Sequence, residues 1–477
     1  MKKILSRRAF KGLLMSSIAA TSGISKVKAK RVVDVTIVGA GLSGLYSALL
    51  LESFGLKTLV LEGRPDRVGG RVYTLYDIPS QPEAGGEIFG PMYARCIDMI
   101  DKLGLKTRSP RIRSQAEKEN YIYNIRNQMI RLDKWESHEF NPFPDSLKGR
   151  TPWEIFYNDL SKDNPMVSLD DWVDVKFKQN DISFAKYLKL KGFNDEAIRL
   201  LEVNSAYGNT LYDVSTLHLQ HYYTWMVQNG KIKKRTQIDG GNQKLPEGMR
   251  GLINGDLLLG KKVVSIENSR NSVEVRTSDD EVYKSRFCIC TLPFSILRNI
   301  NVETPLSGLQ RQAVETLPYY STYQIHYEIL KPYWEIDGMP QSMWSDGSIG
   351  RANVLTDEYD KNKACLLLYI NGLQAQYLDR MTMEDAEKFI RSELIRIRPS
   401  IEGSIKLLRV HSNQRDPYIA GSYAYWKPGA PTTLPMVMSK PHGRLHFAGE
   451  HTSISSRGME GAMESAERVV SEILQKS

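Results

Sequence analysis

Residues 33–44 read Val-Asp-Val-Thr-Ile-Val-Gly-Ala-Gly-Leu-Ser-Gly, a β-branched apolar run that leads into three closely spaced glycines. The apolar run predicts a buried parallel strand, and the residues from 42 to 54 predict a helix. A second strand is expected over 57–62, with Glu62 as its last residue. Strand, glycine turn, helix and strand form a βαβ unit, so the sequence predicts an α/β fold around a parallel sheet.

Each glycine of this turn has its own physical task. Gly39 permits the tight turn, Gly41 lets the backbone approach a pyrophosphate, and Gly44 allows the helix and strand to pack closely. The first helical turn, with Ser43, then directs a partial positive charge at the phosphates. Glu62 is placed to accept hydrogen bonds from an adenosine ribose. The pattern predicts a dinucleotide site and does not decide between NAD and FAD.

More glycines and arginines follow at the same edge of the predicted sheet. Gly63 and Arg64 come directly after Glu62, and Gly70 and Arg71 stand a few residues later. Backbone amides at Gly70 and the Arg71 guanidinium suit phosphate oxygens and the edge of a flavin ring. A solvated basic turn is the alternative interpretation.

A second glycine-rich segment lies near the other end of the chain. Residues 445–452 read Leu-His-Phe-Ala-Gly-Glu-His-Thr and include Gly449 and Glu450. A helix is expected to begin at Gly458 and to contain Met459. The two glycine-rich segments together favour FAD as the cofactor.

The rest of the chain separates into stretches of two characters. Strand-rich stretches at 30–92, 231–304 and 416–477 are assigned to a discontinuous Rossmann-type FAD-binding domain. The insertions 93–230 and 305–415 are assigned to an α+β substrate-binding domain. A chain of 477 residues is long enough for two such cores. Individual helices are expected over 195–202, 383–397 and 458–474.

The first 29 residues differ from everything that follows, because they hold lysines and arginines but no Asp or Glu. A basic start, an uncharged stretch at 12–25 and Val-Lys-Ala at 27–29 are typical of an export signal with its cleavage site. Residues 6–11, Ser-Arg-Arg-Ala-Phe-Lys, resemble the twin-arginine signature, which predicts export to the periplasm or beyond by the twin-arginine machinery. The uncharged stretch is shorter than the ~20 residues that span a bilayer, so no membrane span is expected in the mature protein.

Composition argues against several other classes of protein. Most of the net charge of +9 lies in the first 29 residues, so the remainder gives no electrostatic case for binding nucleic acid. Four scattered cysteines are too few for a disulfide framework and are expected to be packing residues. The eight histidines show no ligand spacing, so no metal is expected.

With these segments in place, the sequence resembles the flavin amine oxidases, the family of monoamine, polyamine and L-amino-acid oxidases. Beyond the two flavin segments, the resemblance is carried by residues 238–242, 262–266, 290–293 and 416–423. It implies oxidation of a C–N bond by hydride transfer to FAD, hydrolysis of the resulting imine, and transfer of electrons to O2 to give hydrogen peroxide. It also implies that the backbone of Val263 meets the adenine.

The resemblance further assigns the substrate slot. Tyr423 stands where the family has one aromatic wall, although a core tyrosine in a strand is the alternative. Gly458 stands where the opposite wall is aromatic, so that side is expected to be open. Ser422 replaces the cysteine that carries flavin in monoamine oxidases, which implies non-covalent FAD. The lysine that often holds a water near the flavin is replaced by Arg298 or Asn299.

The electron acceptor is left open by the sequence. Asn413 replaces a tryptophan of the family, and together with the missing lysine this keeps a second hypothesis, an amine dehydrogenase that passes electrons to a periplasmic carrier. A non-catalytic flavin-binding partner is a third hypothesis. The oligomeric state also stays open, and an oligomer is compatible with the sequence.

The inferred class of substrate depends on which residue occupies position 93. Residues 90–92, Gly-Pro-Met, resemble the L-amino-acid oxidases, whose carboxylate-binding arginine should follow directly, but Tyr93 occupies that position. Arg95 is close by and is expected to be structural on a helix. The exchange favours an amine without a required carboxylate. An L-amino-acid oxidase that gives a 2-oxo acid remains the alternative, with Arg95 or Arg298 as its carboxylate partner.

Overall fold

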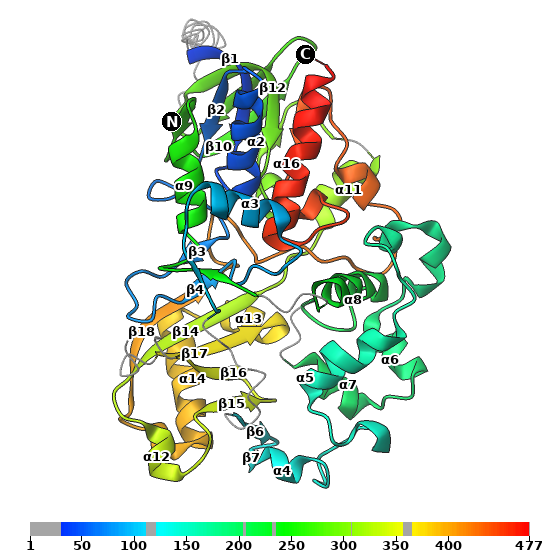
Figure 1. Cartoon of the computed structure of the whole chain (residues 1–477), viewed down its shortest axis with the longest axis vertical. Coiled ribbons are helices and arrows are strands. Elements are labelled where there is room, and N and C mark those ends of the chain that lie inside the picture. Colours follow the sequence, from blue (N-terminus) through cyan, green and yellow to red (C-terminus); the bar gives the residue numbers. More distant parts are fainter. Residues whose placement is uncertain are drawn as a thin grey trace, which may run out of the picture.

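The βαβ unit predicted near the N-terminus lies at the centre of the first of two large sheets. The computed structural model describes residues 30–110, 121–203, 207–230, 235–306, 308–355 and 365–476. The predicted export signal at 1–29 lies outside the described residues. The first sheet occupies the upper part of the molecule in Figure 1, and the second sheet and most of the short helices lie below it.

The first sheet has the strand order β13-β10-β11-β12-β1-β2-β9, and β19 pairs with β12. β1 pairs in parallel with both β2 and β12, as predicted for a buried strand that feeds a helix. Its strands are β1 (Lys30–Val38), β2 (Thr58–Leu61), β9 (Asp256–Leu258), β10 (Val263–Asn268), β11 (Val273–Thr277), β12 (Val282–Cys290), β13 (Asn301–Val302) and β19 (Leu445–Phe447).

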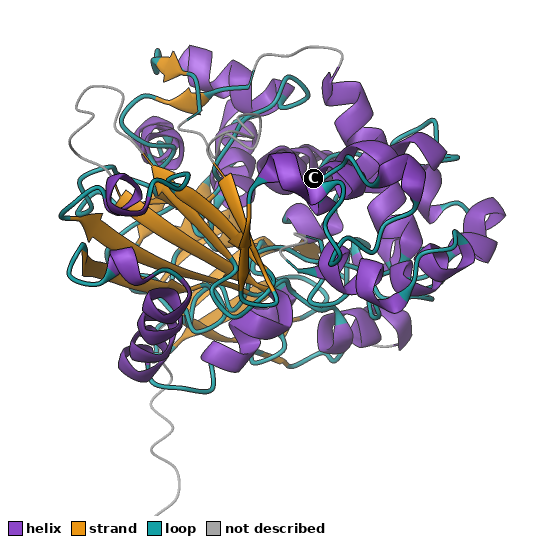
Figure 2. Cartoon of the chain, turned by 90° about the horizontal axis from the view of Figure 1, so that it is seen from below, coloured by secondary structure: helices purple, strands orange, loops and turns teal. Residues whose placement is uncertain are grey.

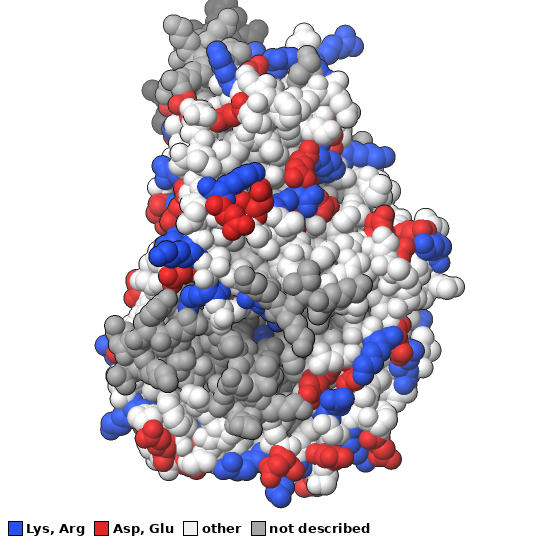
Figure 3. All heavy atoms as spheres, viewed as in Figure 1, with Lys and Arg blue, Asp and Glu red and all other residues white. Residues whose placement is uncertain are grey.

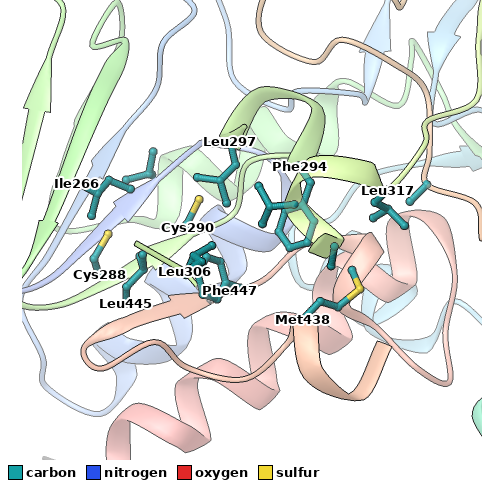
Figure 4. Packing of buried hydrophobic residues seen from close by; sticks show 14 of the residues in the cluster. Ile266, Cys288, Cys290, Phe294, Leu297, Leu306, Leu317, Met438, Leu445 and Phe447 are labelled. Atoms are coloured by element: carbon teal, nitrogen blue, oxygen red, sulfur yellow. The ribbon is translucent and has the colours of Figure 1, made fainter. Parts of the chain in front are cut away.

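Both faces of this sheet are covered by apolar side chains. α2 (Leu42–Ser53) and α16 (Gly458–Leu474) lie side by side on one face (Figure 1), where they bury Val35 and Ile37 of β1. On the other face Cys288 and Cys290 pack with Phe294 and other apolar side chains, as Figure 4 shows. All four cysteines are buried and free, which confirms that they are packing residues.

The second sheet joins segments from both insertions. Its order is β18-β14-β17-β16-β15-β6-β7. Its strands are β6 (Tyr121–Ile125), β7 (Gln128–Ile130), β14 (Thr322–Ile329), β15 (Ser342–Ser345), β16 (Arg351–Leu355), β17 (Cys365–Asn371) and β18 (Ile405–Ser412). α13 (Gly372–Leu378) and α14 (Met383–Ile397) pack against it around a separate apolar cluster. The mixed α/β class predicted from the sequence is thereby confirmed.

The first insertion contributes a group of mostly short helices. α4 (Leu132–Trp135), α5 (Pro152–Glu154), α6 (Phe184–Leu190), α7 (Asp195–Glu202) and α8 (Thr216–Gly230) lie beside the second sheet. Seen from below in Figure 2, strands gather on one side of the molecule and helices on the other. α8 extends from this helical part toward the first sheet, which allows its side chains to reach the site described below.

One stretch of the first insertion belongs with the first sheet. α3 (Ala94–Lys102) packs on α16 and on α9 (Lys244–Leu252). Further short strands and α-helices of the described residues are β3 (Tyr73–Thr74), β4 (Glu83–Gly85), β5 (Thr107–Arg108), β8 (Gln237–Ile238), α10 (Phe294–Leu297), α11 (Gly308–Thr316), α12 (Tyr333–Asp337) and α15 (Pro435–Met438).

The outer surface has no dominant charge on the face drawn in Figure 3, where basic and acidic side chains are interspersed over the described residues. Within the described ranges no helix combines the length and apolarity needed to cross a bilayer.

Candidate active site

A cavity of about 770 Å³ lies where β1 and β2 end and where α2 and α16 begin. Its wall continues through the segment after Asp416 and reaches the side chains of α8. The sequence-predicted residues that line it are Gly39, Gly41, Ser43, Glu62, Gly63, Arg64, Gly70, Arg71, Val263, Tyr423, Gly449, Glu450, Gly458 and Met459. Two glycine-rich segments from opposite ends of the chain therefore meet at one site.

The glycine turn at the end of β1 has the geometry that a dinucleotide requires. Gly39 has a φ of +103°, which favours glycine. A Cβ atom at Gly41 would have no other atom within 4 Å, so the backbone there faces open space in the cavity. A Cβ at Gly44 would lie 2.0 Å from the carbonyl oxygen of Gly39. Gly44 does not line the cavity, and its task is the close packing of α2 on β1.

Two helices direct their N-termini at this cavity. α2 begins after Gly41 and α16 after Arg457, and neither helix has a side-chain hydrogen bond that caps its first turn. The first N–H groups of a helix have no partner within the helix, and together they carry a partial positive charge. Both helix ends are thus suited to anionic or electron-rich groups of a bound cofactor.

Glu62 is held at the end of β2 by two backbone donors. Its Oε2 accepts the Ala40 N–H at 2.8 Å, and its Oε1 accepts the Arg64 N–H at 2.8 Å. Burial raises the pKa of Glu62, while the two backbone hydrogen bonds act in the opposite direction. Each carboxylate oxygen keeps a second lone pair that is able to accept a further hydrogen bond.

The two arginines assigned to the cofactor each have an acidic partner in the protein. Arg64 pairs with Asp416, and its guanidinium carbon lies 4.7 Å from the centre of the Tyr418 ring. Arg71 Nη1 donates to Glu450 Oε1 at 2.7 Å and to the Ser422 carbonyl oxygen at 2.7 Å. Arg71 therefore ties the N-terminal and C-terminal flavin segments together at the cavity wall.

These features fit FAD. The cradle has room for a pyrophosphate at Gly41, two helix N-termini, and an oriented carboxylate for the ribose. Val263 lines the cavity at the start of β10, where the resemblance implies the adenine. The backbone and side chains required for a flavin dinucleotide are thus gathered in one place.

The far end of the cavity is aromatic. The Tyr423 ring stacks on Tyr320 with centres 5.1 Å apart and lies 6.1 Å from the Tyr207 ring. Tyr207 in turn stacks on Tyr222 of α8 at 3.8 Å. Tyr207, Tyr222 and Trp225 line the cavity, and sequence reasoning missed all three. Their only sequence signal is the aromatic character of the first insertion, which does not show which rings face inward.

Gly458 lines the cavity and stands where the resemblance implies an aromatic wall. Gly458 has a φ of +55° and is exposed to the cavity. A Cβ there would lie 3.6 Å from the hydroxyl oxygen of Tyr93. The Tyr93 ring packs edge-on against Trp225 with centres 5.8 Å apart. At this point the cavity wall is therefore formed by a glycine together with the Tyr93 and Trp225 rings.

The prediction for Arg298 needs correction. Its Nε donates to the Phe294 carbonyl oxygen at 3.1 Å and its Nη2 to the Leu317 carbonyl oxygen at 2.9 Å. The side chain follows the short helix α10 and does not line the cavity, whereas Asn299 does. Arg95 also lies away from the cavity.

Arg95 is structural, as expected. Its guanidinium pairs with Glu460 at 3.0 Å and with Glu467 at 2.8 Å, and both acids belong to α16. The helix α3 is fastened to α16 by these contacts. Neither Arg95 nor Arg298 is therefore placed to hold a carboxylate in the cavity.

Ser422 lines the cavity and belongs to a polar network at its wall. Its hydroxyl lies 2.7 Å from Thr322 Oγ1 and accepts a hydrogen bond from Asn413 Nδ2 at 2.7 Å. Asn413 is buried and also donates to Thr322 Oγ1 at 2.9 Å. Asn413 stands where the resemblance implies a tryptophan, and Ser422 stands where it implies a flavin-linked cysteine. The Asn413 amide thus orients the Ser422 hydroxyl.

Comparison with known proteins agrees with this geometry. Residues 42–474 match the family model described as flavin containing amine oxidoreductase. The chain belongs to this family. The flavin-containing amine oxidase B of Homo sapiens is 27% identical over 467 residues, covering 92% of this chain and 86% of the relative. The Sus scrofa protein of the same name is 28% identical over 466 residues, with the same coverage.

Solved structures of flavin amine oxidases share the fold. Putrescine oxidase in complex with putrescine superposes with a TM-score of 0.75 at 21% identity, covering 93% of this chain and 99% of that chain. Cyclohexylamine oxidase from Brevibacterium oxydans IH-35A gives a TM-score of 0.73 at 20% identity, covering 94% and 99%. The protein is a flavin-dependent amine oxidoreductase with FAD as its cofactor.

Proposed function

We propose that this protein is an amine oxidase that passes electrons from the substrate to O2 and produces hydrogen peroxide. The observation that carries the proposal is the single cavity, in which the dinucleotide cradle continues into a slot lined by Tyr423, Tyr207 and Tyr222. When bound, FAD supplies the acceptor for a hydride from the carbon next to the amine nitrogen. Water then hydrolyses the imine to an aldehyde or ketone and releases ammonia or an amine.

The chain itself contributes a dry, shaped slot. Aromatic side chains exclude water, and a low-polarity environment disfavours the protonated amine, so the reactive neutral form is favoured. Burial raises the pKa of Tyr423 well above its usual value of 10.0, so this residue keeps its proton and acts as a wall. Tyr320 behind it fixes the plane of the ring.

An amine dehydrogenase remains the competing function because of Asn299. This residue lines the cavity near the position where the family has a lysine, and its Nδ2 donates to the Ser295 carbonyl oxygen at 3.2 Å. An amide cannot supply the charge that a lysine brings to a bound water.

The test is anaerobic reduction of the purified flavoprotein with a panel of amines and amino acids, followed by mixing with air in a stopped-flow instrument. Bleaching of the flavin by an amine with fast reoxidation by air supports the oxidase. Bleaching with slow reoxidation by air and fast reoxidation by a soluble one-electron acceptor favours the dehydrogenase. A flavin that no compound of the panel bleaches contradicts both functions and favours a non-catalytic flavin-binding partner.

We further propose that FAD is held without a covalent bond, since a serine hydroxyl engaged by Asn413 stands at position 422. Denaturation by mild acid or heat should release the yellow colour into the supernatant. Flavin that stays with the precipitated chain would contradict this.

Export by the twin-arginine route to the periplasm or beyond is also proposed, on the pattern of residues 1–29 alone. Replacing Arg7 and Arg8 together by lysine should leave the protein in the cytoplasmic fraction of a bacterial host. Unchanged export of that variant would rule the route out.

A further inference from the structure

An arginine side chain on the N-terminal side of α16 lines the substrate end of the cavity. Arg457 directly precedes Gly458 and is half-buried, with part of its surface on the cavity. Its Nη1 lies 3.3 Å from His221 Nδ1 and 3.4 Å from the His218 carbonyl oxygen. Its Nη2 lies 3.2 Å from His218 Nε2. All of these partners belong to α8.

The groups around this guanidinium are uncharged. Burial and the nearby Arg457 charge lower the pKa of His218 and of His221 well below 6.5, so both imidazoles are neutral near pH 7. The Arg457 guanidinium carbon also lies 5.7 Å from the centres of the Tyr207 and Tyr222 rings. Within the part of the chain that the structure describes, every polar contact of this cation is with a neutral group.

Three acidic side chains that lie on the cavity wall or follow Arg457 in the chain are engaged elsewhere. Glu450 accepts from Arg71 and from the Ala424 N–H. Glu460 is paired with Arg95. Glu464 accepts three backbone N–H groups of residues 454–456. A cation in a cavity of low polarity without a counter-ion is unfavourable, and an anion brought by a ligand removes that penalty.

We propose that Arg457 binds a carboxylate of the substrate, so that the substrate is an amine that also carries a carboxylate a few bonds from its nitrogen, as amino acids do. The inference rests on the proposed oxidase function for the fate of the amine. The Tyr207 ring lies next to both Tyr423 and Arg457. The ring proposed to face the amine and the cation proposed to bind the carboxylate are therefore separated by this one side chain.

The placement also accounts for Tyr93. The resemblance to L-amino-acid oxidases implies an arginine at position 93, and the sequence alone therefore favoured an amine without a carboxylate. In the structure the Tyr93 hydroxyl faces Gly458, next to Arg457. The positive charge absent from position 93 is supplied from the N-terminus of α16, and the tyrosine hydroxyl adds a donor beside it.

For an α-amino acid the reaction balances with the reactants already named. The carbon loses a hydride to FAD and the nitrogen loses a proton, so that a C=N bond forms. Water replaces the nitrogen to give a 2-oxo acid and ammonia. O2 takes up the two electrons with two protons and becomes hydrogen peroxide. The carboxylate is unchanged, which suits a role in binding alone.

The decisive experiment compares each common L-amino acid with its own amide, because the amide keeps the size of the substrate and removes the charge. For the preferred side chain, kcat/KM should be about 30- to 100-fold higher for the acid than for the amide, as expected for a charged hydrogen-bonded pair. Arg457→Met should abolish this ratio, and Arg457→Lys should retain part of it. Arg311→Met, which changes an exposed arginine paired with Glu315 on α11, is the matched control and should leave the ratio intact.

A binding measurement separates this inference from the oxidase proposal. Benzoate and benzamide should each perturb the absorbance of the oxidised flavin when they bind. In the wild type the dissociation constant of benzoate should be about 30-fold lower than that of benzamide, and in Arg457→Met the two constants should be equal. That result supports the carboxylate site even if no amine bleaches the flavin, in which case only the oxidase function fails. Equal kcat/KM for acids and amides in the wild type, or an equal loss on both with Arg457→Met, overturns the inference. If Arg457→Met does not fold, the wild-type ratios and Arg457→Lys decide.

Discussion

The two ends of the cavity are built by different means. At the cofactor end the contacts come from backbone at strand and helix ends, with Gly39 and Gly41 before α2 and Gly449 before α16. At the substrate end they come from side chains, with Tyr207 and Tyr423 from segments more than two hundred residues apart. Backbone that approaches a ligand closely demands glycine at fixed spacing, whereas an aromatic wall accepts rings from any segment that reaches it. The first leaves a sequence pattern and the second does not.

The largest effect is expected at the cofactor end, from Gly44→Ala. The added Cβ would lie 2.0 Å from the Gly39 carbonyl oxygen, so α2 must move away from β1 and the turn must open. We expect loss of bound FAD and a decrease of about 3 kcal/mol or more in the free energy of unfolding. The flavin-to-protein absorbance ratio and a denaturant titration measure both.

Gly251→Ala is the matched control for this change. A Cβ at Gly251 in α9 meets no atom within 4 Å, so the variant should keep its flavin and unfold like the wild type. Full flavin content in Gly44→Ala would show that the turn tolerates a rearrangement and that the backbone account of the cofactor end is wrong.

A smaller and purely functional effect is expected at the substrate end, from Tyr423→Ala. Loss of the ring removes one wall and its stacking on Tyr320, so kcat/KM should fall about 10- to 100-fold while FAD stays bound. Steady-state kinetics together with flavin content test this. Tyr423→Phe keeps the ring and should retain most of the activity, and Tyr377→Ala removes an exposed ring as a control. Unchanged kinetics in Tyr423→Ala would remove this residue from the slot.

The smallest effect is expected in the pH dependence of the free energy of unfolding, to which the buried histidines at the substrate end contribute. His221 is buried, and its folded-state pKa lies well below 6.5, so the unfolded chain binds more protons than the folded chain at acidic pH. Its contribution to stability is complete above about pH 6.5 and is lost as the pH falls, by up to about 1.4 kcal/mol per pH unit. His218 behaves in the same way and adds its own contribution.

His221→Gln should therefore reduce the acid sensitivity of the free energy of unfolding by up to about 1.4 kcal/mol per pH unit. Urea titrations at several values between about pH 7 and about pH 5 give the slope for each protein. Identical slopes would mean that His221 is protonated in the folded protein, and the neutral surroundings of Arg457 would have to be reconsidered.

The elements that repeat a local pattern were predicted well. The helices expected over 195–202, 383–397 and 458–474 appear as Asp195–Glu202, Met383–Ile397 and Gly458–Leu474. The first strand and helix were likewise placed within three residues of their ends. In each case apolar periodicity and a glycine or a polar cap determine the element without reference to distant residues.

The direction of individual side chains was predicted less well. Arg298 was expected beside the flavin, but the short helix α10 turns it toward the Leu317 carbonyl oxygen and leaves Asn299 at the cavity. Arg457 was overlooked because its neighbours in the chain carry no sign of its role. Its surroundings come from α8, in the first insertion, and no local pattern connects the two segments.

The sequence by itself determined that this protein has a dinucleotide cradle at the end of a parallel sheet. The turn from Gly39 to Gly44 is dictated by backbone sterics, and all the residues that decide it lie within the twelve-residue stretch 33–44. Its glycine-rich C-terminal segment was enough to favour FAD and to resemble the flavin amine oxidases. Only the tertiary structure decided what faces the substrate. There, α8 brings two neutral histidines and a tyrosine to Arg457, and this cation is left without an acidic partner among the described residues because the nearby carboxylates are held by other donors.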